Sequence, residues 1–270
     1  MSLNTVYVKS IRYPFRASQF RQTRGMCTAC GADDATFVYN DVISDDLASE
    51  WGVNKSLQKA YSQRESMHCS ECRCSARLRA QARALTILID ESQPSLQHAI
   101  VSGGFNDLKV AEINACGDLH SILAGIKRLS YSEYAPKDKK IQKEDLHKLS
   151  YGDAAFDYVL TSDTLEHVPE VNKALSEIYR VLRPGGYHVF TVPLIFSRLS
   201  RRRIVADGEV SIKLGPSYHG SGEPDNIVVT EFGIDFIISL NEAGFSTNIY
   251  FGNPINKNEV NYVLVSRREP

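Results

Sequence analysis

Short apolar runs alternate with amphipathic segments along the C-terminal two thirds of the chain. From residue 110 onward, strand-like runs of four to seven residues are separated by segments of helical periodicity. This alternation is typical of a parallel α/β sheet. The expected strands are residues 110–113, 129–134, 156–161 and 187–192, with a terminal hairpin of residues 245–251 and 259–266.

Helices are expected between these strands. The apolar face of the strongest one consists of Val171, Ala174, Leu175, Ile178, Val181 and Leu182. A weaker helix is expected near residues 119–127. Another should open at Thr230, run through Phe232, Phe236 and Leu240, and end with Gly244 as its C′ residue.

A different pattern precedes residue 110. Ser75 is a good N-cap for a helix over residues 76–90, on which Leu78 and Leu85 lie on one face and Arg77, Arg79 and Arg83 on others. Residues 91–107 contain Pro94 and two consecutive glycines, which favour a boundary. We therefore predict a module over residues 1–90 and a second domain over residues 91–270.

Two CxxC pairs give the front module its chemistry. Cys27 and Cys30 are followed by Cys69 and Cys72, and two such knuckles supply four thiolates for a tetrahedral, structural Zn²⁺ site. Cys74 and His68 are candidate substitutes for one thiolate, and unliganded thiols or a redox pair are the alternative. Residues 36–39 are expected to form a short strand, and residues 51–61 a helix or covering loop.

Composition and charge exclude other classes. The 270 residues are 43% hydrophobic and 23% charged, and the net charge is −1, so a disordered chain and a globally basic nucleic-acid binder are both excluded. No apolar run approaches the ~20 residues of a membrane span. No secretory signal is seen at the N-terminus, so a cytoplasmic location is expected. Residues 1–89 are mildly basic, with 12 Lys and Arg against 8 Asp and Glu.

The segment from Phe156 to Val168 (FDYVLTSDTLEHV), followed by Tyr179–Gly186 (YRVLRPGG), resembles the class I S-adenosylmethionine-dependent methyltransferases. The similarity covers about residues 107–268. The resemblance implies a Rossmann-like sheet of seven strands whose last strand is antiparallel, with the cofactor at the carboxyl ends of the strands. The preceding zinc module resembles a subgroup associated with saccharide modification.

The resemblance also implies which residues contact the cofactor. Glu112 would orient the first turn or the methionine ammonium, Glu133 would accept both ribose hydroxyls, and Asp145 with Leu146 would flank the adenine. Ser162 and Asp163 would line the methionine end. The family's glycine-rich first turn is replaced here by Asn114–Gly117 (NACG), in which Asn114 tolerates positive φ and Gly117 keeps one glycine.

Transfer of a methyl group to oxygen needs a base, and the candidates are His167 and His219. Residues 194–228 are expected to cover the acceptor. They carry Arg198, Arg201, Arg202, Arg203 and Lys213, which either bind an anionic acceptor or form a solvated face with intrachain ion pairs. The leading hypothesis is O-methylation of a small or saccharide-type acceptor. The alternatives are an RNA- or protein-directed enzyme and a non-catalytic interaction protein.

Overall fold

The computed structural model describes residues 21–206, 210–212, 214, 217, 227–252 and 260–270. Its centre is a seven-stranded sheet in the order β14-β15-β8-β7-β4-β5-β6. These strands are β4 (Val110–Ile113), β5 (Leu129–Glu133), β6 (Gln142–Lys143), β7 (Phe156–Ser162), β8 (Leu182–Thr191), β14 (Phe245–Phe251) and β15 (Tyr262–Arg268). Neighbours among β6, β5, β4, β7 and β8 pair in parallel, whereas β15 is antiparallel to both β8 and β14. The predicted sheet, with its last strand reversed, is confirmed.

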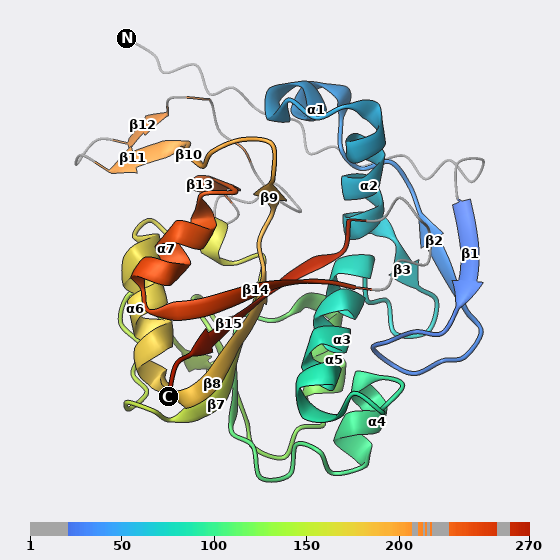
Figure 1. Ribbon diagram of the computed structural model, residues 1–270, viewed down its shortest axis with the longest axis vertical. Helices are drawn as coiled ribbons and strands as arrows, with labels where there is room; N and C mark the ends of the chain where they lie inside the picture. Colours follow the sequence, from blue (N-terminus) through green and yellow to red (C-terminus); the bar gives the residue numbers. More distant parts are fainter. Residues whose placement is uncertain (1–20, 207–209, 213, 215–216, 218–226, 253–259) are drawn as a thin grey trace.

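Helices cover both faces of this sheet (Figure 1). On one side lie α6 (Val171–Val181) and α7 (Phe236–Glu242), and on the other lie α3 (Ala76–Asp90), α4 (Leu96–Val101) and α5 (His120–Leu123), which follows the short helix η2 (Gly117–Leu119). As predicted, Gly244 is the C′ residue of α7, with φ of 95°. Among the described helices, none has the length and apolar composition needed to cross a membrane.

The N-terminal segment forms a small unit of its own secondary structure. Strands β1 (Arg21–Gly25), β2 (Ala35–Tyr39) and β3 (His68–Cys69) make an antiparallel sheet. Between β2 and β3 lie α1 (Asp45–Trp51) and α2 (Lys55–Ser66), each begun by a polar N-cap, Ser44 and Asn54. The expected strand over residues 36–39 and a helix within residues 51–61 are both present.

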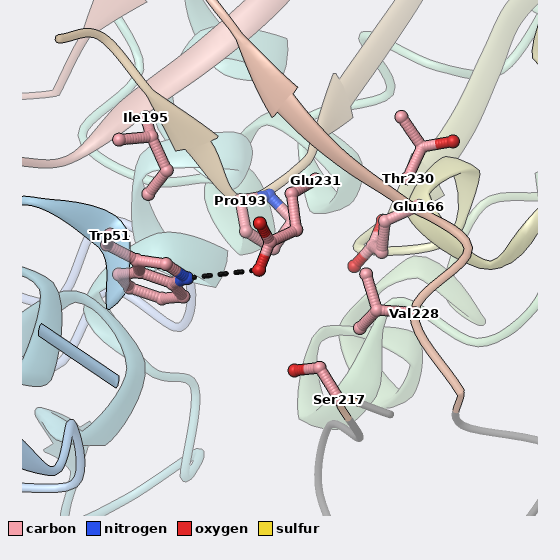
Figure 2. A pocket seen from close by; sticks show the side chains of 8 residues that line it. All are labelled: Trp51, Glu166, Pro193, Ile195, Ser217, Val228, Thr230 and Glu231. Carbon is pink, nitrogen blue, oxygen red and sulfur yellow. Dashed lines mark hydrogen bonds between the residues drawn. The ribbon is translucent and has the colours of Figure 1, made fainter. Parts of the chain in front are cut away.

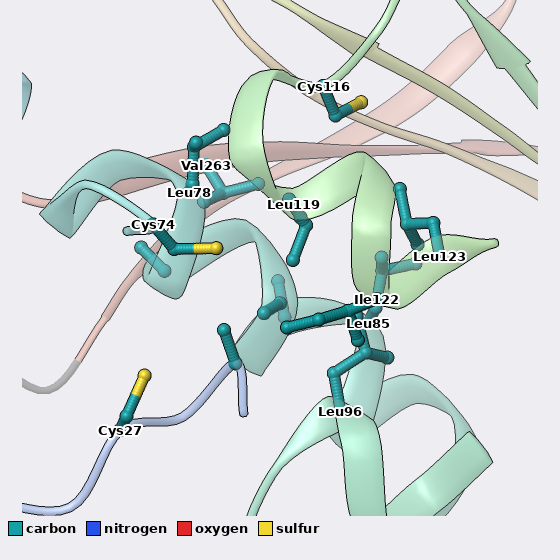
Figure 3. Packing of buried hydrophobic residues seen from close by; sticks show 14 of the residues in the cluster. Cys27, Cys74, Leu78, Leu85, Leu96, Cys116, Leu119, Ile122, Leu123 and Val263 are labelled. Carbon is teal, nitrogen blue, oxygen red and sulfur yellow. The ribbon is translucent and has the colours of Figure 1, made fainter. Parts of the chain in front are cut away.

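Helix α3 joins this unit to the sheet. Leu78 and Leu85 of α3, Leu96 of α4, Leu119 of η2 and Val263 of β15 belong to one buried cluster, which extends to Cys27 (Figure 3). A second cluster fills the space between the opposite sheet face, α6 and α7. The apolar core therefore continues from the N-terminal unit into the α/β domain.

Arg79 of α3 is buried: it is 4% exposed and donates to the carbonyl oxygens of Met67 and Cys74 at 2.6 and 3.0 Å. Helix α3 lies between the N-terminal unit and the sheet, so its first turns have no open face. Residues 91–107 also contain α4, whose first backbone N–H groups donate to the carbonyls of Thr28 and Ala29.

Thr230 begins a strand rather than the predicted helix. Strand β13 (Thr230–Gly233) pairs in parallel with β9 (Leu194–Ile195) and antiparallel with β10 (Arg201–Arg202), and α7 starts only at Phe236. A further hairpin consists of β11 (Ile204–Ala206) and β12 (Val210–Ile212). Strand pairing on both edges of β13 therefore outweighs the helical spacing of its phenylalanines.

The arginines of this region converge on one buried carboxylate. Glu231, 7% exposed, accepts hydrogen bonds from Arg198, Arg201 and Arg203. The shortest joins Arg203 Nη2 to Glu231 Oε1 at 2.6 Å. Its Oε1 also accepts from the indole N–H of Trp51 at 3.3 Å (Figure 2). These guanidinium groups are engaged within the chain, as the ion-pair alternative predicts, although they lie largely buried. Lys213 lies outside the described residues.

The buried cluster of Glu231 with its three arginines predicts that the free energy of unfolding depends on pH. Burial alone would raise the pKa of Glu231, but Arg203, Arg201 and Arg198 together hold it below its ordinary value of 4.5. A lowered folded-state pKa stabilises the fold above the unfolded pKa, and this contribution is lost as pH falls through the folded pKa. We expect Glu231→Gln to lower the free energy of unfolding at pH 7 by about 3 kcal/mol in urea titrations.

The difference between Glu231→Gln and the parent protein should shrink below about pH 4.5. Glu242→Gln, at an exposed position of α7, is the matched control and should change the unfolding free energy little. If the two substitutions change the free energy of unfolding equally at pH 7, Glu231 does not stabilise the fold through its buried ion pairs.

Candidate functional site

A crevice of about 540 Å³ opens at the carboxyl ends of β4, β5 and β7. Parallel pairing brings these ends to one edge of the sheet, which is where open α/β sheets bind ligands. The crevice lining includes Asn114, Glu133, Asp145, Leu146, Ser162, Asp163 and His167, all predicted from the sequence. Two other predicted cofactor residues, Glu112 and Gly117, are not part of that lining.

Glu112 supports the turn after β4. Its carboxylate is fully buried, and it accepts the backbone N–H of Cys116 at 2.8 Å and contacts His120 Nδ1 at 2.7 Å. Of the two roles expected for Glu112, its contacts correspond to the orientation of the turn. Gly117 has φ of 54°, and a Cβ at this position would lie 3.1 Å from Leu78, so it is needed where η2 approaches α3.

The turn itself passes along the crevice without glycine at its first positions. Asn114 adopts φ of 57°, as its residue type allows, and its side-chain oxygen accepts the backbone N–H of Tyr134 at 2.9 Å. That bond ties the end of β4 to the end of β5, where Glu133 accepts a hydrogen bond from Tyr131. The replaced glycine turn therefore leaves the crevice open, with a carboxylate at its edge.

Asp145 and Leu146 line the crevice beyond β6. The Asp145 carboxylate accepts the backbone N–H of His147 at 2.9 Å and contacts His147 Nδ1 at 2.7 Å. Burial would raise the pKa of Asp145, but these two contacts with His147 lower it below its usual value. At neutral pH the crevice therefore presents an ionised acceptor beside the apolar side chain of Leu146.

The turn after β7 is fixed by contacts of Asp163 and Ser162 with Thr191 and Arg77. Asp163 has φ of 46°, a left-handed conformation that is uncommon for a residue other than glycine. Its carboxylate accepts from Thr191 Oγ1 at 2.8 Å and lies 3.1 Å from Nε of Arg77. Ser162 accepts from the same guanidinium.

His167 follows in η3 (Leu165–His167) and also lines the crevice. Its Nδ1 lies 2.8 Å from the carbonyl oxygen of Ile227, which can only accept, so Nδ1 carries a proton. In the neutral imidazole the lone pair is then on Nε2, which lies 3.7 Å from Glu166 Oε1. His219, the other predicted base, lies outside the described residues.

Sequence reasoning missed His147, Arg64 and Arg77. His147 lines the crevice and is two positions after the predicted Asp145, so its closeness in sequence could have indicated it. Arg77 was placed only on a face of its helix other than that of Leu78 and Leu85, and its side chain is 16% exposed and contacts Asp163. Nothing in the helical periodicity distinguishes an inward arginine from a solvated one when both faces of a helix are covered.

The four predicted metal ligands come together in the N-terminal unit. The sulfur atoms of Cys27, Cys30, Cys69 and Cys72 all lie within 4.8 Å of one another, and Cys27 Sγ is 3.7 Å from Cys72 Sγ. Four sulfurs at 2.3 Å from a central Zn²⁺ would be about 3.8 Å apart, so the cluster fits such an ion. All six cysteines are free thiols, and neither Cys74 nor His68 belongs to the cluster.

Comparison with known proteins agrees with this geometry. Residues 118–190 match the family model described as a methyltransferase domain. A ubiquinone/menaquinone biosynthesis C-methyltransferase UbiE from Brucella anthropi is 30% identical over 108 residues, which are 37% of this chain and 41% of the relative. The homonymous protein of Bartonella bacilliformis is 28% identical over 171 residues, 56% of this chain and 64% of the relative. The chain thus spans less than two thirds of either.

Among the solved structures that the comparison matches is the 1,6-didemethyltoxoflavin-N1-methyltransferase of Burkholderia thailandensis, with bound 1,6-didemethyltoxoflavin and S-adenosylhomocysteine. It is 15% identical, covers 87% of this chain and 96% of its own, and has a TM-score of 0.40. The sheet order, with a crevice at the carboxyl ends of its parallel strands, is that of a Rossmann-like α/β fold. The segment that matches the methyltransferase-domain model, residues 118–190, runs from η2 into β8 of this sheet.

Proposed function

We propose that this protein transfers the methyl group of S-adenosylmethionine to a small-molecule acceptor. The observation that carries the proposal is the open crevice at the strand ends, bordered by Glu133 and Asp145. Glu133 would accept the ribose hydroxyls, Asp145 the adenine amine, and Leu146 would pack on the ring. The bound cofactor supplies an electrophilic methyl group on a positively charged sulfur.

The methyl-accepting atom is proposed to be a hydroxyl oxygen, on a saccharide-type or other small molecule. A hydroxyl must lose its proton near the moment of attack, and His167 is the candidate base because it lines the crevice and its Nδ1–H donates to the Ile227 carbonyl, which orients the ring. The names of the relatives mention C- and N-methylation of quinones, phosphoethanolamine and toxoflavin. Those names favour a small acceptor without fixing its reacting atom.

The macromolecular alternative rests on the mildly basic residues 1–89 and on the arginines of residues 198–203. Of these arginines, Arg198, Arg201 and Arg203 are paired with Glu231. An anionic polymer would have to compete with this buried carboxylate. The non-catalytic alternative relied on the altered first turn, which leaves the crevice open.

We also propose that the Cys27–Cys30–Cys69–Cys72 cluster holds a structural Zn²⁺. Four sulfur ligands fill a tetrahedral shell, so no position remains for substrate. The ion would tie the loop before β2, which carries Cys27 and Cys30, to Cys69 of β3 and Cys72 of the loop before α3. A redox role would instead require a readily ionised thiol, whereas Cys27 and Cys69 are almost fully buried and burial raises the pKa of the partly exposed Cys30 to about 11.

Cofactor binding is the first test. Calorimetry should detect micromolar binding of S-adenosylhomocysteine to the parent protein. Glu133→Gln should weaken it by about tenfold or more, because a neutral amide is a poorer acceptor for two hydroxyls. Glu91→Gln, exposed at the far end of α3, is the matched control. Absence of binding by the parent protein would contradict the proposed activity.

The acceptor and its base are tested by transfer of a labelled methyl group. Pools of sugar nucleotides, glycans, quinols and RNA should be compared, and label is expected in small hydroxyl compounds. His167→Gln should lower the turnover rate by about a hundredfold while leaving S-adenosylhomocysteine affinity close to the parent value. Label found only in RNA, or an unchanged rate in this variant, would contradict the acceptor and the base respectively.

Metal content tests the cysteine cluster. Elemental analysis should find one Zn²⁺ per chain in the parent protein and almost none in Cys30→Ser, whose thermal midpoint should fall. Cys74→Ser, which alters a buried thiol outside the cluster, should keep its zinc. A Cys74→Ser protein that lacks zinc while Cys30→Ser retains it would refute the assigned ligand set.

A further inference from the structure

Two arginines of the N-terminal unit reach under the cofactor crevice. Arg77, in the first turn of α3, lies with its Nε 3.1 Å from Asp163 Oδ2 and 3.0 Å from Glu65 Oε2. Its Nη1 donates to Thr191 Oγ1 at 3.1 Å and to Ser162 Oγ. Arg64, near the end of α2 and 1% exposed, has its guanidinium 3.9 Å from Asp163 and 4.6 Å from the centre of the Tyr262 ring.

The contacts of Arg77 are concentrated on the turn after β7. Asp163 in this turn adopts φ of 46°, in the left-handed region that Asp enters more readily than most residues other than glycine. Arg77 and Thr191 both contact its carboxylate and so fix the side chain of this turn residue. Ser162 and Asp163 line the crevice, so their position decides its shape at the expected methionine end.

Arg77 is itself fixed by the unit that carries the cysteines. Cys72 and Cys74 stand immediately before α3, whose N-cap is Ser75, so Arg77 is only five residues from a cluster ligand. Glu65 supplies the second carboxylate from α2. Two guanidinium groups thus balance two carboxylates in a buried network shared between the N-terminal unit and the sheet.

We propose that Arg77 is a positioning residue of the cofactor crevice: the N-terminal unit holds its guanidinium, and the guanidinium holds Asp163 and Ser162 in the geometry that binds the cofactor. The inference rests on the proposed function, since it concerns the same crevice. It gives the N-terminal unit a part in cofactor binding, although the crevice lining comes from the α/β domain.

The test is a double-mutant cycle read by calorimetry with S-adenosylhomocysteine. Arg77→Gln should weaken binding by about tenfold, which is typical of coupled contacting residues. If Arg77 acts through Asp163, the double variant Arg77→Gln/Asp163→Asn should bind no more weakly than Asp163→Asn alone. Arg77→Lys should recover part of the affinity, since an ammonium keeps the ion pair but not the fork of donors.

Arg83→Gln is the matched control on the same helix, because Arg83 donates to the Gln93 carbonyl, away from the crevice. It should bind like the parent protein, and every variant should keep the zinc content of the parent. Additive losses in the cycle, or parent affinity in Arg77→Gln, would overturn the inference while the proposed function stands. If Arg77→Gln does not fold, the same cycle with Arg77→Lys decides. A parent protein that does not bind S-adenosylhomocysteine would remove both proposals.

Discussion

Parallel pairing of β4 with β5 and with β7 is the constraint on which the site depends. The register aligns Ile113 with Ser132 and Glu112 with Leu160, so the carboxyl ends of the three strands meet at one edge. Each strand is followed by a turn that cannot continue the ladder and must open above the sheet. Residues distant in sequence, such as Asn114, Glu133 and Asp163, line one crevice as a result.

Buried ion pairs fasten the N-terminal unit onto this scaffold at two places. Arg77 and Arg64 contact Asp163 beneath the crevice. At the second place, Arg203 pairs with both Glu50 of α1 and Glu231 of β13, and Glu231 also accepts from Trp51. A buried charge lowers the stability of the fold unless its partners are fixed close to it. Each of these two ion-pair clusters therefore depends on accurate packing around it. Between the two clusters, Tyr61 donates to the Leu194 carbonyl at 2.8 Å. The front of the chain is thereby integrated with the sheet through polar as well as apolar contacts.

The sequence predicted the features that follow from local pattern or spacing. The seven-stranded sheet, its reversed last strand and the meeting of the four cysteines follow from periodicity, the family resemblance or two CxxC motifs. What could not be predicted depends on neighbours remote in sequence. Thr230 lies in a strand because β9 and β10 flank it, and Arg79 is buried because α3 is covered on both sides. The contact of Arg77 with Asp163 could not be predicted, because the two residues are 86 positions apart in the sequence. The division at residue 90 and the roles assigned to individual site residues stay predictions.

A crystal structure of the full chain with S-adenosylhomocysteine bound would test the central claim most directly. The account predicts electron density for the nucleoside over the ends of β4, β5 and β7, with the ribose hydroxyls within hydrogen-bonding distance of Glu133. The homocysteine end should lie beside Ser162 and Asp163. Density for the nucleoside at any other surface, with these carboxylates uninvolved, would contradict it.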